Sequence, residues 1–334
     1  MEYAHQEKPV AGKIILRAGN EKGFLKNRMC VNINVSDICN FSCSYCINSA
    51  SKEKAKRILD KNILAQFIDD LEERKNDTYQ FAVAGGEPLL YPHINFLVKK
   101  IDETISSTNK MIKIATNASL LPEKGESLYA AAKNTKIMFS VSVHTEQIKI
   151  VSFAKKIAQF GHHDDIKCKI LFLPGKLKET KKMIDIFSIN NIETILSVVT
   201  HQKGIPFQYS PEELGFMQQH PTANHKQLFH EYTDHSVEEF DRITRGLHPE
   251  KFNYKGMKCC AGRNTLRLAP DGTCARCFGF LRLGEKFNLS ERRLRNIPEL
   301  STYCVCPADF CTCLTFLQTP KWRLPEDKPE YIRS

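Results

Sequence analysis

Short β-branched runs alternate with amphipathic stretches from residue 31 to about residue 200. Six of these runs are typical of strands, at residues 31–35, 79–84, 111–116, 137–143, 166–172 and 194–199. Between the first strands, apolar residues recur with the helical i, i+3, i+4, i+7 spacing, as around Phe67 and Leu97. Strands that alternate with helices form a parallel sheet with right-handed crossovers. The pattern therefore predicts an α/β fold, a partial (β/α)6 TIM-like barrel, because a complete barrel would need two further units.

The remaining segments differ from this barrel in composition. We expect an N-terminal extension at 1–27, the barrel at 28–200, a linker or lid segment at 201–257, a cysteine-rich domain at 258–317 and a loosely packed C-terminal tail at 318–334. Short helices are expected at 211–218 and 236–247. The run LRLAPDGTCARCF predicts a β-hairpin that turns at Asp271 and Gly272.

Cysteine content and charge limit the possible functions. The N-terminus lacks the apolar stretch of a signal peptide, and no apolar run approaches the ~20 residues of a membrane span, so we expect a cytoplasmic protein without membrane partners. The cytosol keeps thiols reduced, so the 13 cysteines favour metal or iron–sulfur ligation over disulfides. The net charge of +10 is spread along the chain, with the densest group at Arg292, Arg293 and Arg295. A solvated basic surface is favoured over docking of an acidic electron donor or binding of nucleic acid.

Three cysteines, Cys39, Cys43 and Cys46, follow the first predicted strand directly. Barrel active sites are built at this end of the strands. A structural zinc site takes four ligands, commonly as two CxxC pairs, and no fourth ligand follows nearby. A 4Fe–4S cluster on three thiolates would leave one iron open for a cofactor or substrate. The count of three therefore favours an iron–sulfur site.

The run CNFSCSYC resembles the CxxxCxΦC signature of the radical S-adenosylmethionine (radical SAM) superfamily, with Tyr45 at the aromatic position. The resemblance implies that Cys39, Cys43 and Cys46 hold a 4Fe–4S cluster whose open iron binds S-adenosylmethionine. It also implies that an electron from a reduced flavodoxin- or ferredoxin-type donor cleaves the cofactor to a 5′-deoxyadenosyl radical. This radical abstracts a hydrogen atom from the substrate.

Further motifs extend the resemblance over residues 28–200. It implies that Gly85, Gly86, Glu87 and Pro88, after the second strand, contact the methionine amino group. Glycines suit that role because they let backbone approach a ligand closely. Thr116 and Asn117 match the end of the third strand, and Ser142 matches a position that often binds the ribose. His144 replaces the acidic residue of many relatives and is a candidate acid or base, although a loop histidine without such a role is favoured.

A second group of cysteines begins near Cys260. The spacing from Cys260 through Gly272 to Cys277 is similar to the opening of the SPASM and twitch extensions, which bind auxiliary 4Fe–4S clusters. The resemblance implies one or two auxiliary clusters, with Cys260 and Cys277 as the surest ligands and others among Cys304, Cys306, Cys311 and Cys313. Cys274 is a weaker candidate, Cys259 a spare residue, Cys168 a core residue, and Cys30 has no assigned role. A zinc ribbon is the alternative for this group.

The combined motifs predict a radical SAM oxidoreductase in which an auxiliary cluster helps to remove an electron from the substrate. Among enzymes of this type the favoured substrate is a ribosomally synthesised peptide, presented if needed by a separate peptide-recognition protein. A dehydrogenase of a sugar or aminocyclitol alcohol is the alternative. A nucleic-acid-modifying protein and a non-catalytic metal scaffold are the alternatives from other classes.

Overall fold

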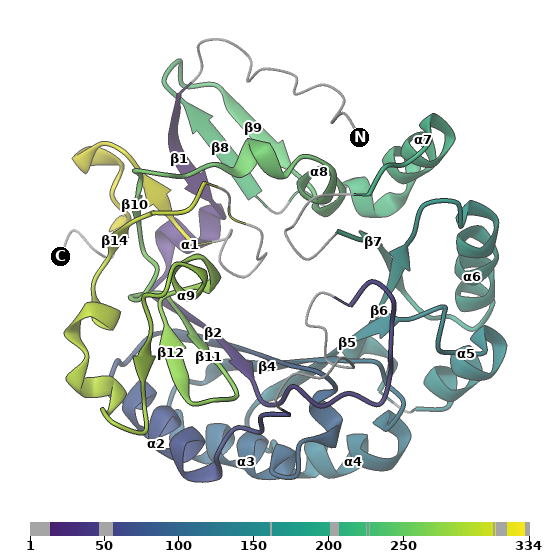
Figure 1. Ribbon diagram of the computed structural model, residues 1–334, viewed down its shortest axis with the longest axis horizontal. Coiled ribbons are helices and arrows are strands. Elements are labelled where there is room, and N and C mark those ends of the chain that lie inside the picture. The colour runs from purple at the N-terminus through teal and green to yellow at the C-terminus, as the bar shows by residue number, and fades with distance from the viewer. Residues whose placement is uncertain are drawn as a thin grey trace.

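The computed structural model describes residues 14–46, 56–160, 162–200, 207–224, 226, 228–309, 311 and 319–330. Within these residues, parallel strands follow one another in sequence order across a curved sheet (Figure 1). They are β2 (Arg28–Asn34), β3 (Thr78–Ala84), β4 (Asn109–Thr116), β5 (Lys136–Val143), β6 (Ile166–Phe172) and β7 (Thr194–Val198). All six predicted barrel strands are therefore confirmed, with shifts of a few residues at their ends.

Helices cover the outer face of this sheet (Figure 1). They are α2 (Lys61–Glu72), α3 (Ile94–Thr104), α4 (Leu121–Ala131), α5 (Ile150–Gln159) and α6 (Leu177–Ile189). Helix α2 begins where the Asp60 carboxylate accepts hydrogen bonds from the backbone N–H groups of Asn62 and Ile63. Its Leu64, Phe67 and Leu71 side chains are buried in the main core. Burial of each such side chain contributes about 1.5–3 kcal/mol, so packing rather than helix propensity fixes the helix position.

Alternation along the strands divides the sheet into two faces. In β4, Ile112 and Ile114 are fully buried against the helices, whereas Lys113 between them is half-buried on the opposite face. The same alternation holds in β6, where Cys168 and Ile170 enter the core and Lys169 faces away from it. We call the face turned away from the helices the inner face. Cys168 is thus confirmed as a core residue.

The C-terminal part of the chain extends the barrel sheet. Strand β11 (Thr265–Leu268) pairs parallel with β2, and β12 (Thr273–Ala275) returns antiparallel to β11. Gly272 in the turn has a φ of +78°, so the predicted hairpin at Asp271 and Gly272 is confirmed. Strand β13 (Phe287–Asn288) completes the edge, and the short helix α9 (Phe278–Arg282) follows β12. Residues from both sides of the predicted boundary at 258 therefore share one sheet.

A second sheet combines segments from both ends of the chain with the region between barrel and hairpin. Its described strands lie in the order β14 (Cys304–Val305), β10 (Lys258–Cys259), β15 (Lys321–Trp322), β1 (Ile15–Gly19), β8 (Leu228–Tyr232) and β9 (Val237–Phe240). Helix α1 (Glu21–Leu25) follows β1, and helix α7 (Pro211–Gln219), close to its predicted range, precedes β8. Among the described residues, no helix has the length and apolar character needed to cross a bilayer.

Two expectations, the helix at 236–247 and the loose packing of the tail, are corrected by this second sheet. Residues 237–240 form a strand, and only α8 (Arg242–Leu247) is helical in the range 236–247, because all four residues of β9 pair antiparallel with β8. The segment expected as a linker or lid therefore contributes a β-hairpin. The tail packs tightly rather than loosely at β15, where Lys321 and Trp322 are buried between β1 and β10.

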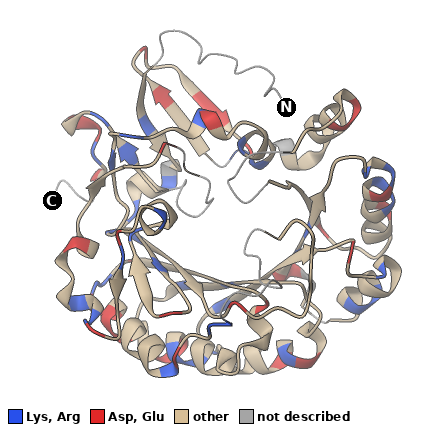
Figure 2. Ribbon diagram, in the orientation of Figure 1, with Lys and Arg blue, Asp and Glu red and all other residues tan. Residues whose placement is uncertain are grey.

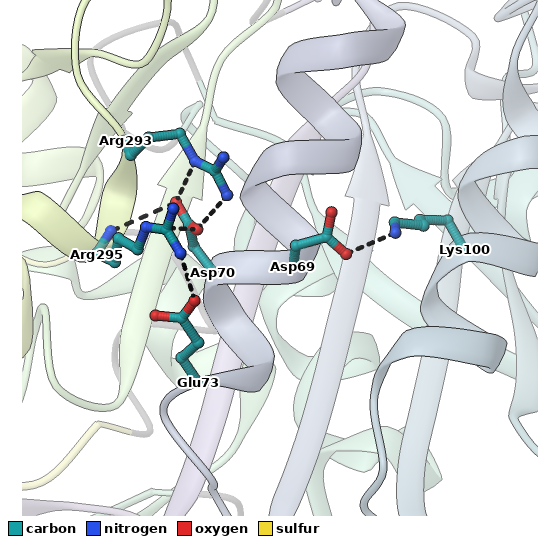
Figure 3. A network of polar contacts seen from close by, with 6 residues as sticks. All are labelled: Asp69, Asp70, Glu73, Lys100, Arg293 and Arg295. Carbon is teal, nitrogen blue, oxygen red and sulfur yellow. Dashed lines mark hydrogen bonds and ion pairs between the residues drawn. The ribbon is translucent and has the colours of Figure 1, made fainter.

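A charged cluster attaches the C-terminal region to the barrel (Figure 3). The buried carboxylate of Asp70 in α2 accepts two hydrogen bonds from the Arg293 guanidinium, one of them at 3.0 Å. Arg295 adds a bond from its Nη1 to Glu73 at 2.9 Å. Bidentate Arg–carboxylate pairs fix both distance and orientation. Two of the three arginines in the densest basic group therefore also pair with carboxylates of α2, although Arg295 remains exposed.

Candidate functional site

The loop of residues 36–46 carries the first cysteine group and starts at the carboxyl end of β2. Its first residues are hydrogen-bonded to the turn that ends β3. The Gly86 N–H donates to the Ser36 carbonyl at 2.7 Å, and the Glu87 N–H donates to the Ile38 carbonyl at 2.7 Å. The GGEP motif thus supports the cysteine loop directly.

The two glycines of this motif are required by that contact. Gly85 has a φ of +147°, and a Cβ there would lie 2.4 Å from the Ser36 carbonyl oxygen. A Cβ on Gly86 would lie 2.1 Å from the Ile38 carbonyl oxygen. From sequence, these glycines are expected because they let the backbone approach a ligand closely. The structure gives a further reason, which is close packing of the turn against the cysteine loop.

Glu87 joins the ends of β3 and β4. Its buried carboxylate accepts hydrogen bonds from Thr116 Oγ1 at 2.7 Å, the Asn117 N–H at 2.7 Å and the Leu89 N–H at 3.0 Å. Burial raises the pKa of this carboxyl, and the three donors act in the opposite direction. Pro88 begins the short 3-10 turn Pro88–Leu90 that follows. Contact between Glu87 and a methionine amino group stays a prediction.

Asn117 connects the end of β4 to the cysteine loop. Its Nδ2 donates to Asn40 Oδ1 at 2.9 Å and lies 4.0 Å from Cys39 Sγ. Asn40 in turn donates to Ser119 Oγ at 2.9 Å. Thr116 and Asn117, both predicted from sequence, therefore lie beside the loop. Thr116 donates a hydrogen bond to Glu87, and Asn117 donates one to Asn40 in the loop.

His144 follows β5 and lies against the same loop. Its Nδ1 is 3.3 Å from Cys43 Sγ and 3.2 Å from the Tyr45 hydroxyl, and its ring stacks on Tyr45. Burial lowers the pKa of His144 to about 4, so the ring is neutral at pH 7. These contacts place His144 next to a thiol and an aromatic ring of the cysteine loop. A role as substrate acid or base stays a prediction.

Glu146 is a supporting residue that the sequence did not single out. Its carboxylate accepts hydrogen bonds from the Ser44 N–H at 2.9 Å and the Ser44 hydroxyl at 2.6 Å. The available signal was an acidic residue shortly after β5, displaced from the position at which many relatives carry one. The cysteine loop is therefore held by the ends of β3, β4 and β5 together.

The donor set of this loop fits an iron–sulfur cluster. Cys46 contributes to the raised pKa of both Cys39 and Cys43, and the Phe41 N–H donates to Cys39 Sγ at 3.4 Å. Burial and then the neighbouring thiols raise the pKa of Cys43 to about 11. Bound iron would stabilise the thiolate form and so offset this rise. Among the described residues, no three His, Cys, Asp or Glu side chains converge closely enough to hold a single metal ion. A 4Fe–4S cluster instead spreads its thiolates around several iron atoms.

Ser142, the predicted ribose contact, lies on the inner face of β5 one residue before the strand ends. Its register partner on β6 is Lys169. Ser142 therefore lies two residues before His144, which contacts the cysteine loop. It also lies next to the basic residue Lys169 on the neighbouring strand. Contact with a ribose stays a prediction.

The second group of cysteines is drawn from three segments. Cys259 on β10 stands opposite Cys304 on β14, and the Cys304 thiol lies 3.7 Å from the Cys259 carbonyl. Cys259 is near enough to raise the pKa of Cys277, Cys306 and Cys311. Every cysteine in the described part of the chain is a free thiol. Five described thiols thus converge in the core beneath the second sheet.

The assignment within this group differs from expectation at Cys259 and Cys260. Cys259, expected as spare, lies among the converging thiols, whereas Cys260, expected as a sure ligand, is buried with Trp322 in a separate cluster. Cys259 is the last residue of β10, and Cys260 follows it outside the strand. Cys274 is buried in the main core, where burial raises its pKa to about 12. Cys313 lies outside the described residues, and ligation by any of these residues stays a prediction.

Two buried cations lie beside the second group. Lys321 donates to the Thr319 carbonyl at 2.7 Å, and its charge favours the thiolate forms of Cys259, Cys306 and Cys311. Arg276, also buried, acts in the same direction on Cys259 and Cys304. A hydrogen bond from Cys304 is the largest cause that lowers the pKa of Cys259 to about 6, with Lys321 adding to it. This environment fits an anionic cluster of thiolates and was not predicted from sequence.

Comparison with known proteins agrees with this geometry. Residues 33–196 match the sequence profile of the Radical SAM superfamily. The chain is 22% identical to a GTP 3′,8-cyclase of Aeromonas hydrophila subsp. hydrophila over 302 residues, which cover 80% of this chain and 83% of that protein. It is 29% identical to a GTP 3′,8-cyclase of Actinobacillus pleuropneumoniae over 141 residues, or 40% of this chain and 39% of that protein.

A solved structure shows the same fold. Streptococcus suis SuiB bound to S-adenosylmethionine superposes with a TM-score of 0.56 and 16% identity, and the match covers 83% of this chain and 67% of that chain. The parallel barrel, the cysteine loop across three strand ends and the profile match all agree. Residues 33–196 therefore form a radical SAM superfamily domain, the type of domain that uses S-adenosylmethionine and a 4Fe–4S cluster.

Proposed function

We propose that this enzyme is a radical SAM oxidoreductase with an auxiliary iron–sulfur cluster in its second cysteine group. The observation that carries the proposal is the presence of two separate cysteine groups with different surroundings. Cys39, Cys43 and Cys46 lie on a half-buried loop at the strand ends. Cys259, Cys277, Cys304, Cys306 and Cys311 converge beside Lys321 and Arg276.

The proposed cofactors and the protein have separate tasks. When bound, S-adenosylmethionine and the two clusters supply a 5′-deoxyadenosyl radical for hydrogen abstraction and an acceptor for the electron left on the substrate. The chain contributes positioning, because Glu87 and Asn117 hold the cysteine loop in place. Lys321 and Arg276 would offset the negative charge of the second group of thiolates. A reduced flavodoxin or ferredoxin is the proposed electron donor.

The substrate is the least constrained part of the proposal. The likeness to SuiB concerns the fold and does not select a peptide, so peptide modification and alcohol oxidation both stay predictions. The relatives named GTP 3′,8-cyclase suggest a third class, a small anionic molecule. Basic side chains on the inner face of the barrel support this third class and are treated below.

The experiment incubates iron-loaded, reduced protein with S-adenosylmethionine without air and measures 5′-deoxyadenosine. We expect 5′-deoxyadenosine from the wild type and from Cys168→Ala, whose thiol is buried in the core away from both groups. We expect none from Cys43→Ala. Absence of product from iron-loaded wild type would contradict the proposal. About one zinc and no iron per chain after anaerobic purification would instead favour a metal scaffold.

A further inference from the structure

Three basic side chains on the inner face of the barrel have no partner among the described residues. Lys113 lies on β4, Lys169 lies on β6, and Arg242 opens helix α8. No hydrogen bond or ion pair joins any of the three to another described residue, and the Arg242 Nε is buried without an acceptor. An unpaired buried donor on a cation is costly in a folded protein, so it calls for an explanation.

The positions of the three residues bring them together. Lys113 and Lys169 face away from the helix-packed core because their strand neighbours occupy it. Arg242 influences the charge of both lysines, although β5 separates the strands that carry them. Its guanidinium therefore lies within electrostatic reach of both lysines. Helix α8 packs against β7, where a Cβ on Gly246 would come within 2.7 Å of Val198. Basic positions on α8 and on the strands are marked in Figure 2.

Two buried cations elsewhere in the molecule, Lys110 and Arg74, have acceptors. Lys110, on the same strand as Lys113, donates to the carbonyls of Asp102 and Ile105 at 2.7 and 2.5 Å. Arg74 donates to the Gly262 carbonyl at 2.8 Å. The chain therefore supplies acceptors for buried cations elsewhere.

Mutual repulsion accompanies this lack of partners. Burial, followed by the charges of Arg242 and Lys113, lowers the pKa of Lys169, and burial followed by Arg242 lowers that of Lys113. Burial and then Arg245 lower the pKa of Arg242 to about 10, so this residue remains cationic at pH 7. The charged groups with the largest effect on these three side chains are all cations. A bound anion would relieve both the repulsion and the missing hydrogen bonds.

We propose that Lys113, Lys169 and Arg242 bind the anionic group of the substrate, a phosphate or diphosphate, on the inner face of the barrel. The proposal rests on the proposed function, since it places the substrate of the radical reaction. Lys169 lies beside Ser142, and Ser142 is close in sequence to His144 at the cysteine loop. A substrate anchored by its anionic group on these cations would extend toward the strand ends where the cofactor is expected. A small phosphorylated metabolite fits this arrangement.

The carboxylate of S-adenosylmethionine is a second source of the same negative charge. It would reach Lys169 beside Ser142 most easily, whereas Lys113 lies nearer the middle of β4 and Arg242 belongs to another element. Variants of Lys113 and Arg242 therefore separate the two sources. Loss of phosphate binding alone indicates a substrate site, and loss of cofactor binding alone indicates a cofactor contact.

The experiment measures binding of inorganic pyrophosphate and of S-adenosylmethionine to the full-length, iron-loaded protein by calorimetry. The variants are Lys113→Met and Arg242→Met, with Lys182→Met on the exposed side of α6 as control. We expect pyrophosphate binding to weaken at least about 10-fold in each inner-face variant and not in the control, because each removes one charge-assisted contact. Binding of S-adenosylmethionine should be unchanged. The melting temperature without ligand should be equal to or above that of wild type, because repulsion is removed.

Three results would overturn the proposal. They are no pyrophosphate binding by wild type, equal binding by wild type and both inner-face variants, and weakened cofactor binding with unchanged pyrophosphate binding. If one variant does not fold, the other gives the same comparison. Pyrophosphate binding requires no radical chemistry, so it can succeed where 5′-deoxyadenosine formation fails. Failure of the anion site is therefore distinguishable from failure of the proposed function.

Discussion

The two cysteine groups of this enzyme differ in exposure and in charge. Cys39 and Cys46 are half-buried on a loop, and the charged side chains with the largest effect on Cys39 and Cys43 are carboxylates and other thiols, which oppose ionisation. Cys259 and Cys306 are buried beneath the second sheet, where Lys321 favours their ionisation. The first group is accessible but poorly compensated. The second is enclosed, and Lys321 partly offsets the rise in pKa that burial causes at Cys306.

This difference indicates which kind of cluster each group is suited to hold. Thiolates without cationic neighbours depend on bound iron for charge compensation, and an accessible loop leaves room for an exchangeable cofactor. Thiolates beside buried cations suit a cluster that stays bound and accepts an electron, because the cations stabilise the added negative charge. Under the proposed function, the first group would generate the radical and the second would accept the electron.

The largest expected effect comes from removal of the first group. In the triple variant Cys39→Ala, Cys43→Ala, Cys46→Ala we expect 5′-deoxyadenosine formation to fall at least about 1000-fold and iron to fall by about four atoms per chain. Iron in the second group should remain, because no described residue belongs to both groups. Iron analysis and product analysis check this outcome. Complete loss of iron would show that the two groups are not independent.

A smaller loss is expected when the support of the first group is disturbed. Gly86→Ala places a Cβ 2.1 Å from the Ile38 carbonyl oxygen, so the turn must move away from the cysteine loop. We expect a destabilisation of about 1–3 kcal/mol with reduced cluster loading in the first group only. The control is Gly215→Ala in α7, where a Cβ meets no atom and helix propensity predicts a gain of about 0.5–1 kcal/mol. Equal behaviour of the two variants in thermal unfolding would contradict the contact.

Paired variants of the CC dipeptide test which residue faces the second group. Cys259→Ser should reduce iron retained by the second group, whereas Cys260→Ser should retain it, because Cys260 packs with Trp322. Visible absorbance and iron per chain, measured in the background that lacks the first group, report the difference. Iron loss only in Cys260→Ser would restore the ligand expected from sequence.

Neutralisation of a buried cation should alter the second group without altering the first. In Lys321→Met we expect the reduction potential of the second cluster to fall by about 70–100 mV, from a unit charge removed at ~7–10 Å and an effective dielectric of ~20. Redox titration followed by electron paramagnetic resonance (EPR) measures both clusters in one sample. A shift confined to the first cluster, or no shift in a folded variant, would refute the proposed compensation.

The smallest effect on chemistry is expected at the charged attachment of the C-terminal region. Arg293→Ala leaves the buried Asp70 carboxylate without its bidentate partner, so we expect stability to fall by about 2 kcal/mol. Arg292→Ala, at an exposed neighbouring position, should change it by less than about 0.5 kcal/mol. Denaturant unfolding compares the two. Neither variant should change the reduction potential of either cluster.

The barrel and the cysteine loop were predictable because local patterns determine them. Strand alternation and helical spacing specify the β2–β7 sheet, and the three cysteines stand directly after β2. The second sheet was not predictable, because β1 and β15 lie at opposite ends of the chain and pair only after folding. The choice between Cys259 and Cys260 also depends on strand orientation, which a CC pair does not reveal. The environments of Lys321 and Arg242 were not predictable from sequence. Lys321 lies near Cys259, which is distant along the chain. The Arg242 Nε has no acceptor among the described residues.

EPR of the reduced enzyme with and without S-adenosylmethionine tests the central claim most directly. In wild type we predict signals from two clusters, of which one changes when the cofactor is added and the other does not. In the Cys39, Cys43, Cys46 triple alanine variant, only the signal that is insensitive to the cofactor should remain. A single cluster in wild type, or a signal in the triple variant that still responds to S-adenosylmethionine, would contradict an open first group and an enclosed second group.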